Sequence, residues 1–85
     1  MRTRIPADEV RVVKILHRVE PGIDHYQRAV LEYNGKYYLG SRLCAVIPNG
    51  PGPIEAIICY DKWFIFQGPF NTIEEAIKKY REIFW

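Results

Sequence analysis

The sequence predicts an α+β domain, in which an antiparallel sheet of about five strands is packed by one C-terminal α-helix. Two passages carry this prediction. In residues 63–84 an apolar run is followed by a Gly-Pro break and then by an amphipathic helical pattern. Asn34-Gly35 separates two runs rich in aromatic and β-branched residues, which is typical of a β-hairpin. With 85 residues, the chain 1–85 is expected to form a single small domain with a modest core.

The N-terminal quarter allows two interpretations. Residues 1–8 are expected to form a short basic arm. In residues 9–19, a helical period gathers Arg11, Lys14 and Arg18 on one face, whereas the many β-branched residues favour a strand. Because the link to the next run is short, as in a hairpin, we predict a strand here and keep a helix as the alternative.

The middle of the chain predicts a hairpin and its continuation. Residues 25–33 and 36–41 are the two strands, and Asn34-Gly35 supplies the positive φ angles of a type I′ turn. Residues 43–47 are expected to continue as an apolar strand after a bulge at Gly40. The proline- and glycine-rich residues 48–53 then form a loop.

Two further strands and the helix complete the prediction. Residues 54–60 are apolar on both faces, so we expect a central strand, and residues 63–67 form the last one. Thr72 and Glu75 predict a capping box, in which the Glu75 carboxylate accepts from the Thr72 amide. The apolar residues that follow recur at helical spacing; they are Ile73, Ala76, Ile77, Tyr80 and Phe84.

Composition bears on the source and the compartment. Isoleucine occurs 11 times, whereas Ser, Thr, Asn and Gln together occur 8 times, a depletion that resembles proteins of hot environments, such as those of an archaeon or its virus. We see no secretory signal and no membrane-spanning run, which predicts a cytoplasmic protein. Cys44 and Cys59 are therefore expected to be reduced core residues, with a disulfide as the alternative in a hyperthermophile.

The sequence shows no recognisable arrangement of catalytic or metal-ligating residues. Ser41 has no nucleophile elbow around it, and the two histidines and two cysteines have no metal-ligand spacing. Glu74-Glu75 suit the N-terminus of a helix, where negative charge is stabilised. We therefore predict no enzyme activity, no catalytic residues, no metal and no cofactor.

Basic residues gather in the first half of the chain. Residues 1–45 hold 8 Lys/Arg against 5 Asp/Glu, and residues 46–85 hold 4 against 5. Cations beside aromatic rings on a sheet face are typical of nucleic-acid binding, although the pI of 8.6 is only mildly basic. The candidate binding residues are Arg2, Arg4, Arg11, Lys14, Arg18, Arg28, Lys36 and Arg42.

A local resemblance concerns residues 66–80. The run from Gly68-Pro69-Phe70 to Ala76, with Tyr80 after it, resembles the strand-to-helix end of AP2-type DNA-binding domains and of integrase arm-binding domains. It is also similar, to a lesser degree, to the turn before the helix of SPOR domains. The first resemblance implies DNA binding through arginines on the sheet, yet residues 54–67 hold Lys62 as their only basic residue.

Two functions are expected from these observations. The first is a small non-enzymatic interaction module, such as an adaptor, inhibitor or accessory protein, which binds a protein partner or self-associates through an exposed strand edge. The alternative is a nucleic-acid-binding domain that uses the basic N-terminal half. No membrane partner is expected.

Overall fold

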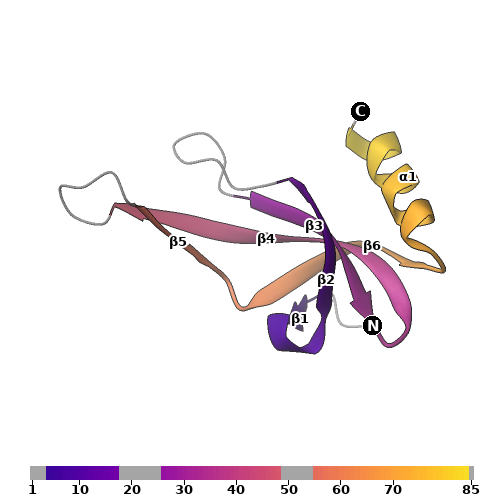
Figure 1. Cartoon of the computed structure of the whole chain (residues 1–85), viewed down its shortest axis with the longest axis horizontal. Coiled ribbons are helices and arrows are strands. Elements are labelled where there is room, and N and C mark those ends of the chain that lie inside the picture. Colours follow the sequence, from indigo (N-terminus) through magenta and orange to yellow (C-terminus); the bar gives the residue numbers. More distant parts are fainter. Residues whose placement is uncertain (1–3, 18–25, 49–54, 85) are drawn as a thin grey trace.

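The computed structural model describes residues 4–17, 26–48 and 55–84. Its elements are β1 (Arg4–Pro6), the 3-10 helix η1 (Ala7–Glu9), β2 (Arg11–His17), β3 (Tyr26–Tyr33), β4 (Lys36–Pro48), β5 (Glu55–Cys59), β6 (Lys62–Phe70) and α1 (Ile73–Phe84). All strand pairs are antiparallel, and one C-terminal helix packs on the sheet (Figure 1). The α+β prediction is therefore confirmed.

The main sheet is curled. Its strand order is β1-β6-β4-β3-β2, so the first two strands of the chain lie at opposite ends of the order. Only residues 7–10 join them. A flat sheet would separate these edges by about 19 Å, beyond the full reach of a five-step extended link at about 17 Å, and the 3-10 turn shortens that link further. The two edges therefore approach each other as the sheet curls.

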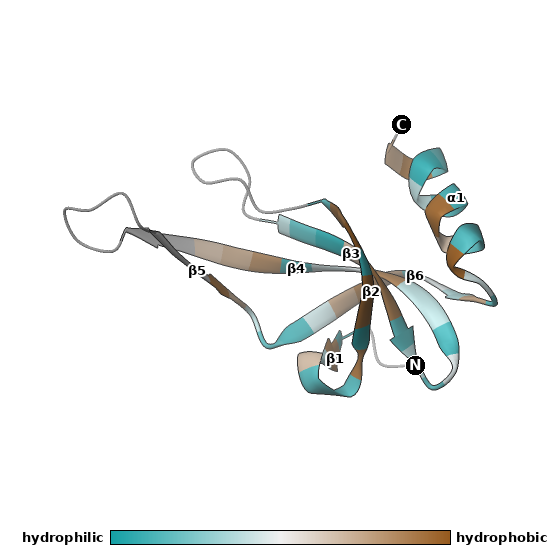
Figure 2. Ribbon diagram, viewed as in Figure 1, coloured by the Kyte–Doolittle hydropathy of each residue, from teal (hydrophilic) through white to brown (hydrophobic). Residues whose placement is uncertain are grey.

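Each face of the sheet has its own core. Ala29 and Leu31 of β3 belong to one cluster, which also holds Trp63. Val30 of β3 belongs to the other, where it meets Ala76 and Tyr80 of α1. The side chains of β3 therefore alternate between the two faces, as expected for a strand that is covered on both sides. Figure 2 shows hydrophobic and hydrophilic residues alternating around α1, as a helix with one buried stripe requires.

The hairpin turn is as predicted. Asn34 and Gly35 have φ angles of 51° and 76°, the left-handed values of a type I′ turn. The following strand β4, however, is continuous through Gly40. The irregularity lies in its partner β6, because one step from Leu39 to Gly40 on β4 matches two steps on β6.

Strand β6 is longer than predicted. It starts at Lys62 and passes through Gly68-Pro69 to Phe70, which pairs with Tyr37. The prediction that Gly-Pro breaks the strand was wrong. A second register shift, between Tyr37 and Leu39 of β4, allows the ladder to continue past Gly68-Pro69 of β6.

Strand β5 was predicted to be central, but it lies at an edge. Among the strands that the structure describes it pairs only with β4, and the two form an arm that projects from the sheet (Figure 1). β5 and β6 follow the same edge of β4. The register passes from Ser41↔Phe64 to Cys44↔Cys59, three steps on β4 against five on the other side. The chain is therefore kinked at residues 60–61, and the two extra residues lie between Tyr60, which still bonds to Leu43, and Phe64.

The N-terminal segment is built into the sheet. Within the stretch expected to be a basic arm, Arg4–Pro6 pairs with β6 and Ile5 is buried in the core. The strand predicted in residues 9–19 is confirmed over Arg11–His17, and residues 18–19 lie outside the described part. Register shifts at Val13 and Leu16 interrupt the alternation of side chains along β2, because both side chains pack on the helix side of the sheet.

The start of α1 follows the predicted capping box with one difference. The Thr72 Oγ1 accepts a hydrogen bond from the Glu75 amide at 3.2 Å, as expected. The Glu75 carboxylate accepts from the amide of Asn71, also at 3.2 Å, one residue earlier than predicted. Both bonds satisfy amides that the helix itself leaves without partners.

Cys44 and Cys59 form a disulfide, so the expectation that both are reduced was wrong. They lie directly opposite each other on β4 and β5. The Tyr60 amide donates to the Leu43 carbonyl at 3.0 Å, which makes Cys44↔Cys59 a non-hydrogen-bonded pair. At such pairs the two backbones are closest, and here the Cα atoms are 3.9 Å apart.

Candidate nucleic-acid interface

The kink at residues 60–61 opens a groove of about 320 Å³ beside the base of the arm. Residues of β1, β3, β4 and β6 contribute to it, together with the kink itself. Its lining residues are Arg4, Tyr26, Ser41, Arg42, Leu43, Tyr60, Asp61, Lys62 and Phe64. Three of these are cations and one is an acid, so the groove favours a negatively charged ligand.

A row of side chains crosses the whole main sheet on the face that α1 partly covers. The register joins Arg4 to Phe64, Phe64 to Ser41, Ser41 to Arg28, and Arg28 to His17. Residues directly opposite each other on neighbouring antiparallel strands share a face. The row therefore places one exposed ring, that of Phe64, between the two arginines Arg4 and Arg28.

A second row runs beside the first at the base of the arm. Tyr26 lies opposite Leu43, and the Leu43 carbonyl accepts a hydrogen bond from the Tyr60 amide. The exposed fractions are 50% for Tyr26, 64% for Tyr60 and 43% for Phe64. Large rings exposed together mark an interaction surface more often than isolated ones do. We call the set Arg4, Tyr26, Arg28, Leu43, Tyr60, Lys62 and Phe64 the basic aromatic face.

Two arginines near the groove, one on β3 and one on β4, are held in place by neighbours. The Arg28 guanidinium lies over the Phe84 ring at 4.4 Å from its centroid, and that of Arg42 lies over Trp63 at 4.5 Å. Arg42 also donates to the Gln27 Oε1 at 2.8 Å. Partial burial lowers the pKa of Arg42 from its ordinary value. An arginine remains charged at neutral pH despite such burial, so Arg42 contributes a fixed cation at the groove.

The predicted candidate residues divide into three groups. Arg4 and Arg28 lie in the cross-strand row of the basic aromatic face, and Arg42 lines the groove from the opposite face of β4, where it packs on Trp63. Arg11, Lys14 and Lys36 lie in neither place: Arg11 is paired with Glu32 at 2.9 Å, Lys36 donates to Asn71 at 2.7 Å, and Lys14 lies exposed on the edge strand β2. Arg2 and Arg18 fall outside the described residues.

Sequence reasoning named only cations as binding residues, and it missed Lys62 and the exposed apolar side chains of the face. Tyr60 and Lys62 flank Asp61 at the kink. Their positions depend on the extra residues at the kink, and the sequence gives no signal for these. The dipeptide Asp61-Lys62 between two apolar runs indicates a change of direction, but not the groove that results from it.

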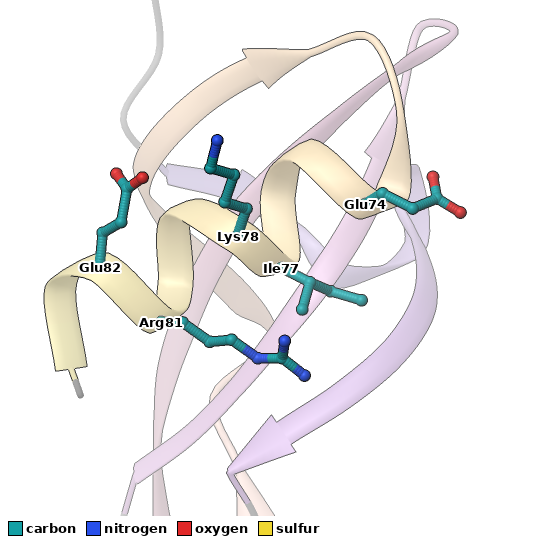
Figure 3. A pocket seen from close by; sticks show the side chains of 5 residues that line it. All are labelled: Glu74, Ile77, Lys78, Arg81 and Glu82. Atoms are coloured by element: carbon teal, nitrogen blue, oxygen red, sulfur yellow. The ribbon is translucent and has the colours of Figure 1, made fainter.

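A second hollow follows the outer surface of α1 (Figure 3). It measures about 440 Å³ and is lined by Glu74, Ile77, Lys78, Arg81 and Glu82, all from the same helix. Its two acids and two cations offset each other. This hollow therefore lacks the charge bias of the basic aromatic face.

The two cysteines are not available as metal ligands or nucleophiles, because both sulfur atoms form the disulfide. Across residues 4–17, 26–48 and 55–84, no group of three or more His, Cys, Asp and Glu side chains is arranged to hold a metal ion. Nor does this part of the chain contain a helix with the length and apolar character needed to cross a membrane.

Comparison with known proteins adds no relative. The chain matches no protein-family model, no curated protein and no solved structure.

Proposed function

We propose that the protein binds single-stranded nucleic acid through the basic aromatic face. Of the two functions expected from the sequence, the geometry favours this alternative over the protein-binding module. The observation that carries the proposal is the cross-strand row in which the exposed Phe64 ring lies between Arg4 and Arg28. Rings stack on bases, and flanking cations pair with phosphates.

A single strand suits this face better than a duplex. The exposed rings of Tyr26, Tyr60 and Phe64 need unstacked bases as partners, and bases within a duplex are already stacked on each other. The face is also a twisted sheet surface, whereas a helix or a projecting ribbon enters a major groove. The apolar arm is no such ribbon, because residues 43–60 contain Glu55 as their only charged residue.

Fluorescence polarisation with labelled single-stranded DNA and RNA of mixed sequence tests the proposal. Binding should weaken as salt rises, with a slope of log K against log salt of about −2 if the three cations of the face meet phosphates. A duplex of the same length should bind more weakly. If no single-stranded oligonucleotide binds at low salt, the proposal is wrong.

A matched pair of variants separates this face from general charge. Arg4→Gln/Arg28→Gln/Lys62→Gln removes three cations from the face, and Lys78→Gln/Lys79→Gln/Arg81→Gln removes three from the helix, where Lys78 and Arg81 are exposed. The first variant should lose most of the affinity and the second should keep it. Equal losses would show that only net charge matters.

A protein partner is the second candidate function. Ile58 is 56% exposed and Leu43 is also exposed, and these aliphatic side chains contribute nothing to base stacking. An exposed aliphatic patch favours a protein surface instead. A pull-down that returns one protein, combined with failure to bind oligonucleotides, would favour this function.

A further inference from the structure

The described sheet has strand edges of two kinds. At β1 and β2 the edges carry features that discourage pairing with another strand. β1 is only three residues long and contains Pro6, and β2 has two register shifts and the cations Arg11 and Lys14. The outer edge of β5 has no such protection. Its ladder with β4 is regular from Glu55 to Cys59, and it contains no cation and no proline.

The hydrogen-bond pattern identifies which backbone groups of β5 face outward. The Tyr60 amide bonds to the Leu43 carbonyl, so in the regular register the pairs at Ile58 and Ala56 are also hydrogen-bonded to β4. The alternate residues Glu55, Ile57 and Cys59 therefore direct their N–H and C=O groups away from β4. Within the described strands, none pairs with this outer edge.

We propose that β5 pairs with β5 of a second copy of this chain, in an antiparallel ladder about a two-fold axis at Ile57. In this register Ile57 lies opposite its own copy, and Glu55 lies opposite Cys59 of the partner. All three outward residues then form hydrogen-bonded pairs. The two arms become one four-stranded sheet, which is more stable than an isolated two-stranded ribbon.

The charges of the segment favour a second copy as the occupant. Glu55 is the only charged residue between Arg42 and Asp61. The two-fold register places the two Glu55 residues at opposite ends of the ladder, about 13 Å apart along the strands, so they do not oppose each other. The arm projects beyond the rest of the sheet (Figure 1), and none of the described strands lies along its outer edge.

A charge-swap experiment tests this register. Wild-type protein should be a dimer by sedimentation equilibrium, and its dissociation should be measurable on dilution. Ile57→Lys and Ile57→Glu each place like charges directly opposite across the axis, so each variant alone should be monomeric. An equimolar mixture of the two should recover the dimer, because the charges are then opposite in sign.

Ile58→Lys provides the matched control. It adds the same charge one residue away, at a position that is already exposed and that does not face its own copy across the axis. This variant should remain a dimer, and circular dichroism should show that all variants are folded. A monomeric wild-type protein, or a dimer that survives Ile57→Lys, would overturn the proposal. A dimer lost equally with Ile58→Lys would show a hydrophobic contact in place of the two-fold ladder. These outcomes do not depend on whether the protein binds nucleic acid.

Discussion

Arg28 of β3 and Phe84 of α1 are in contact across the sheet–helix boundary, with the guanidinium 4.4 Å from the ring centroid. The same ring meets Tyr80 at 4.7 Å and Phe66 at 5.9 Å. The last turn of the helix is thereby fixed beside the cross-strand row. The predicted interface and the helix therefore share a side chain, and a change at Phe84 should affect stability and the position of Arg28 together.

Replacement of Phe84 by leucine should destabilise the protein by about 1–2 kcal/mol, because the cation–π and aromatic contacts are lost while most of the apolar area stays. Urea denaturation measures this change. Ile83→Ala is the control: Ile83 has the same exposed fraction of 42% but belongs to none of the ring contacts described for this helix. Its effect should be smaller. Equal effects would mean that Phe84 contributes only apolar area.

The disulfide between Cys44 and Cys59 should be a main source of the stability of the arm. The bond closes a loop with a sequence separation of 15, for which the chain-entropy argument gives about 3 kcal/mol. Cys44→Ala/Cys59→Ala should lower the free energy of unfolding by about that amount, and a reductant should do the same to the wild type but not to the variant. Two free thiols titrated in native protein purified without reductant would contradict the bond.

The ion pair between Arg11 and Glu32 should give a small pH dependence to stability. The hydrogen bond from Arg11 Nε, 2.9 Å long, lowers the pKa of Glu32 below that of a free glutamate. A lowered folded-state pKa means that the pair stabilises the fold above the unfolded-state pKa, and this contribution is lost as pH falls through the folded-state value. A double-mutant cycle with Arg11→Gln and Glu32→Gln should therefore show coupling at neutral pH and none in acid. Coupling that persists in acid would exclude this cause.

Local sequence signals predicted most helices and strands, but they did not predict the register in which the strands pair. The turn at Asn34-Gly35 and the cap at Thr72 depend on residues a few positions apart, so the sequence reveals them. The position of β5 depends on how one edge of β4 is shared between β5 and β6. The apolar composition of β5 led to the wrong prediction, because an apolar strand of an arm has the same composition as a central strand. The bulges that carry β6 through Gly68-Pro69 depend on contacts with a strand about 30 residues earlier in the chain.

The candidate site shows the same division. Arg4, Arg28 and Arg42 were chosen for charge, which composition reveals. Tyr60 and Lys62 join them only because two extra residues kink the chain beside β4. Cys44 and Cys59 meet for a related reason: the register, and not their spacing in sequence, places them opposite each other. A single sequence contains the residues of such a site but not the offsets that bring them together.

Gly40 is required for the close approach of three strands, and Gly40→Ala should be strongly destabilising. A Cβ at this position would lie 2.6 Å from the Leu31 Cδ1 and 3.3 Å from the Phe64 carbonyl oxygen. Leu31 is fully buried, so its side chain has no free space to enter, and the backbone of Phe64 would have to shift instead. Overpacking of this kind costs about 1–3 kcal/mol.

Two measurements separate this steric cause from a general effect of alanine. Denaturation should show the loss of stability for Gly40→Ala. The double variant Gly40→Ala/Leu31→Ala should be less destabilised than the sum of its single variants, because the shorter side chain makes room for the new methyl group. Strict additivity would mean that Leu31 is not the obstacle. Because Gly40 also neighbours Phe64 across the β4–β6 ladder, the single variant should weaken oligonucleotide binding by moving Phe64, and the double variant should recover part of that loss.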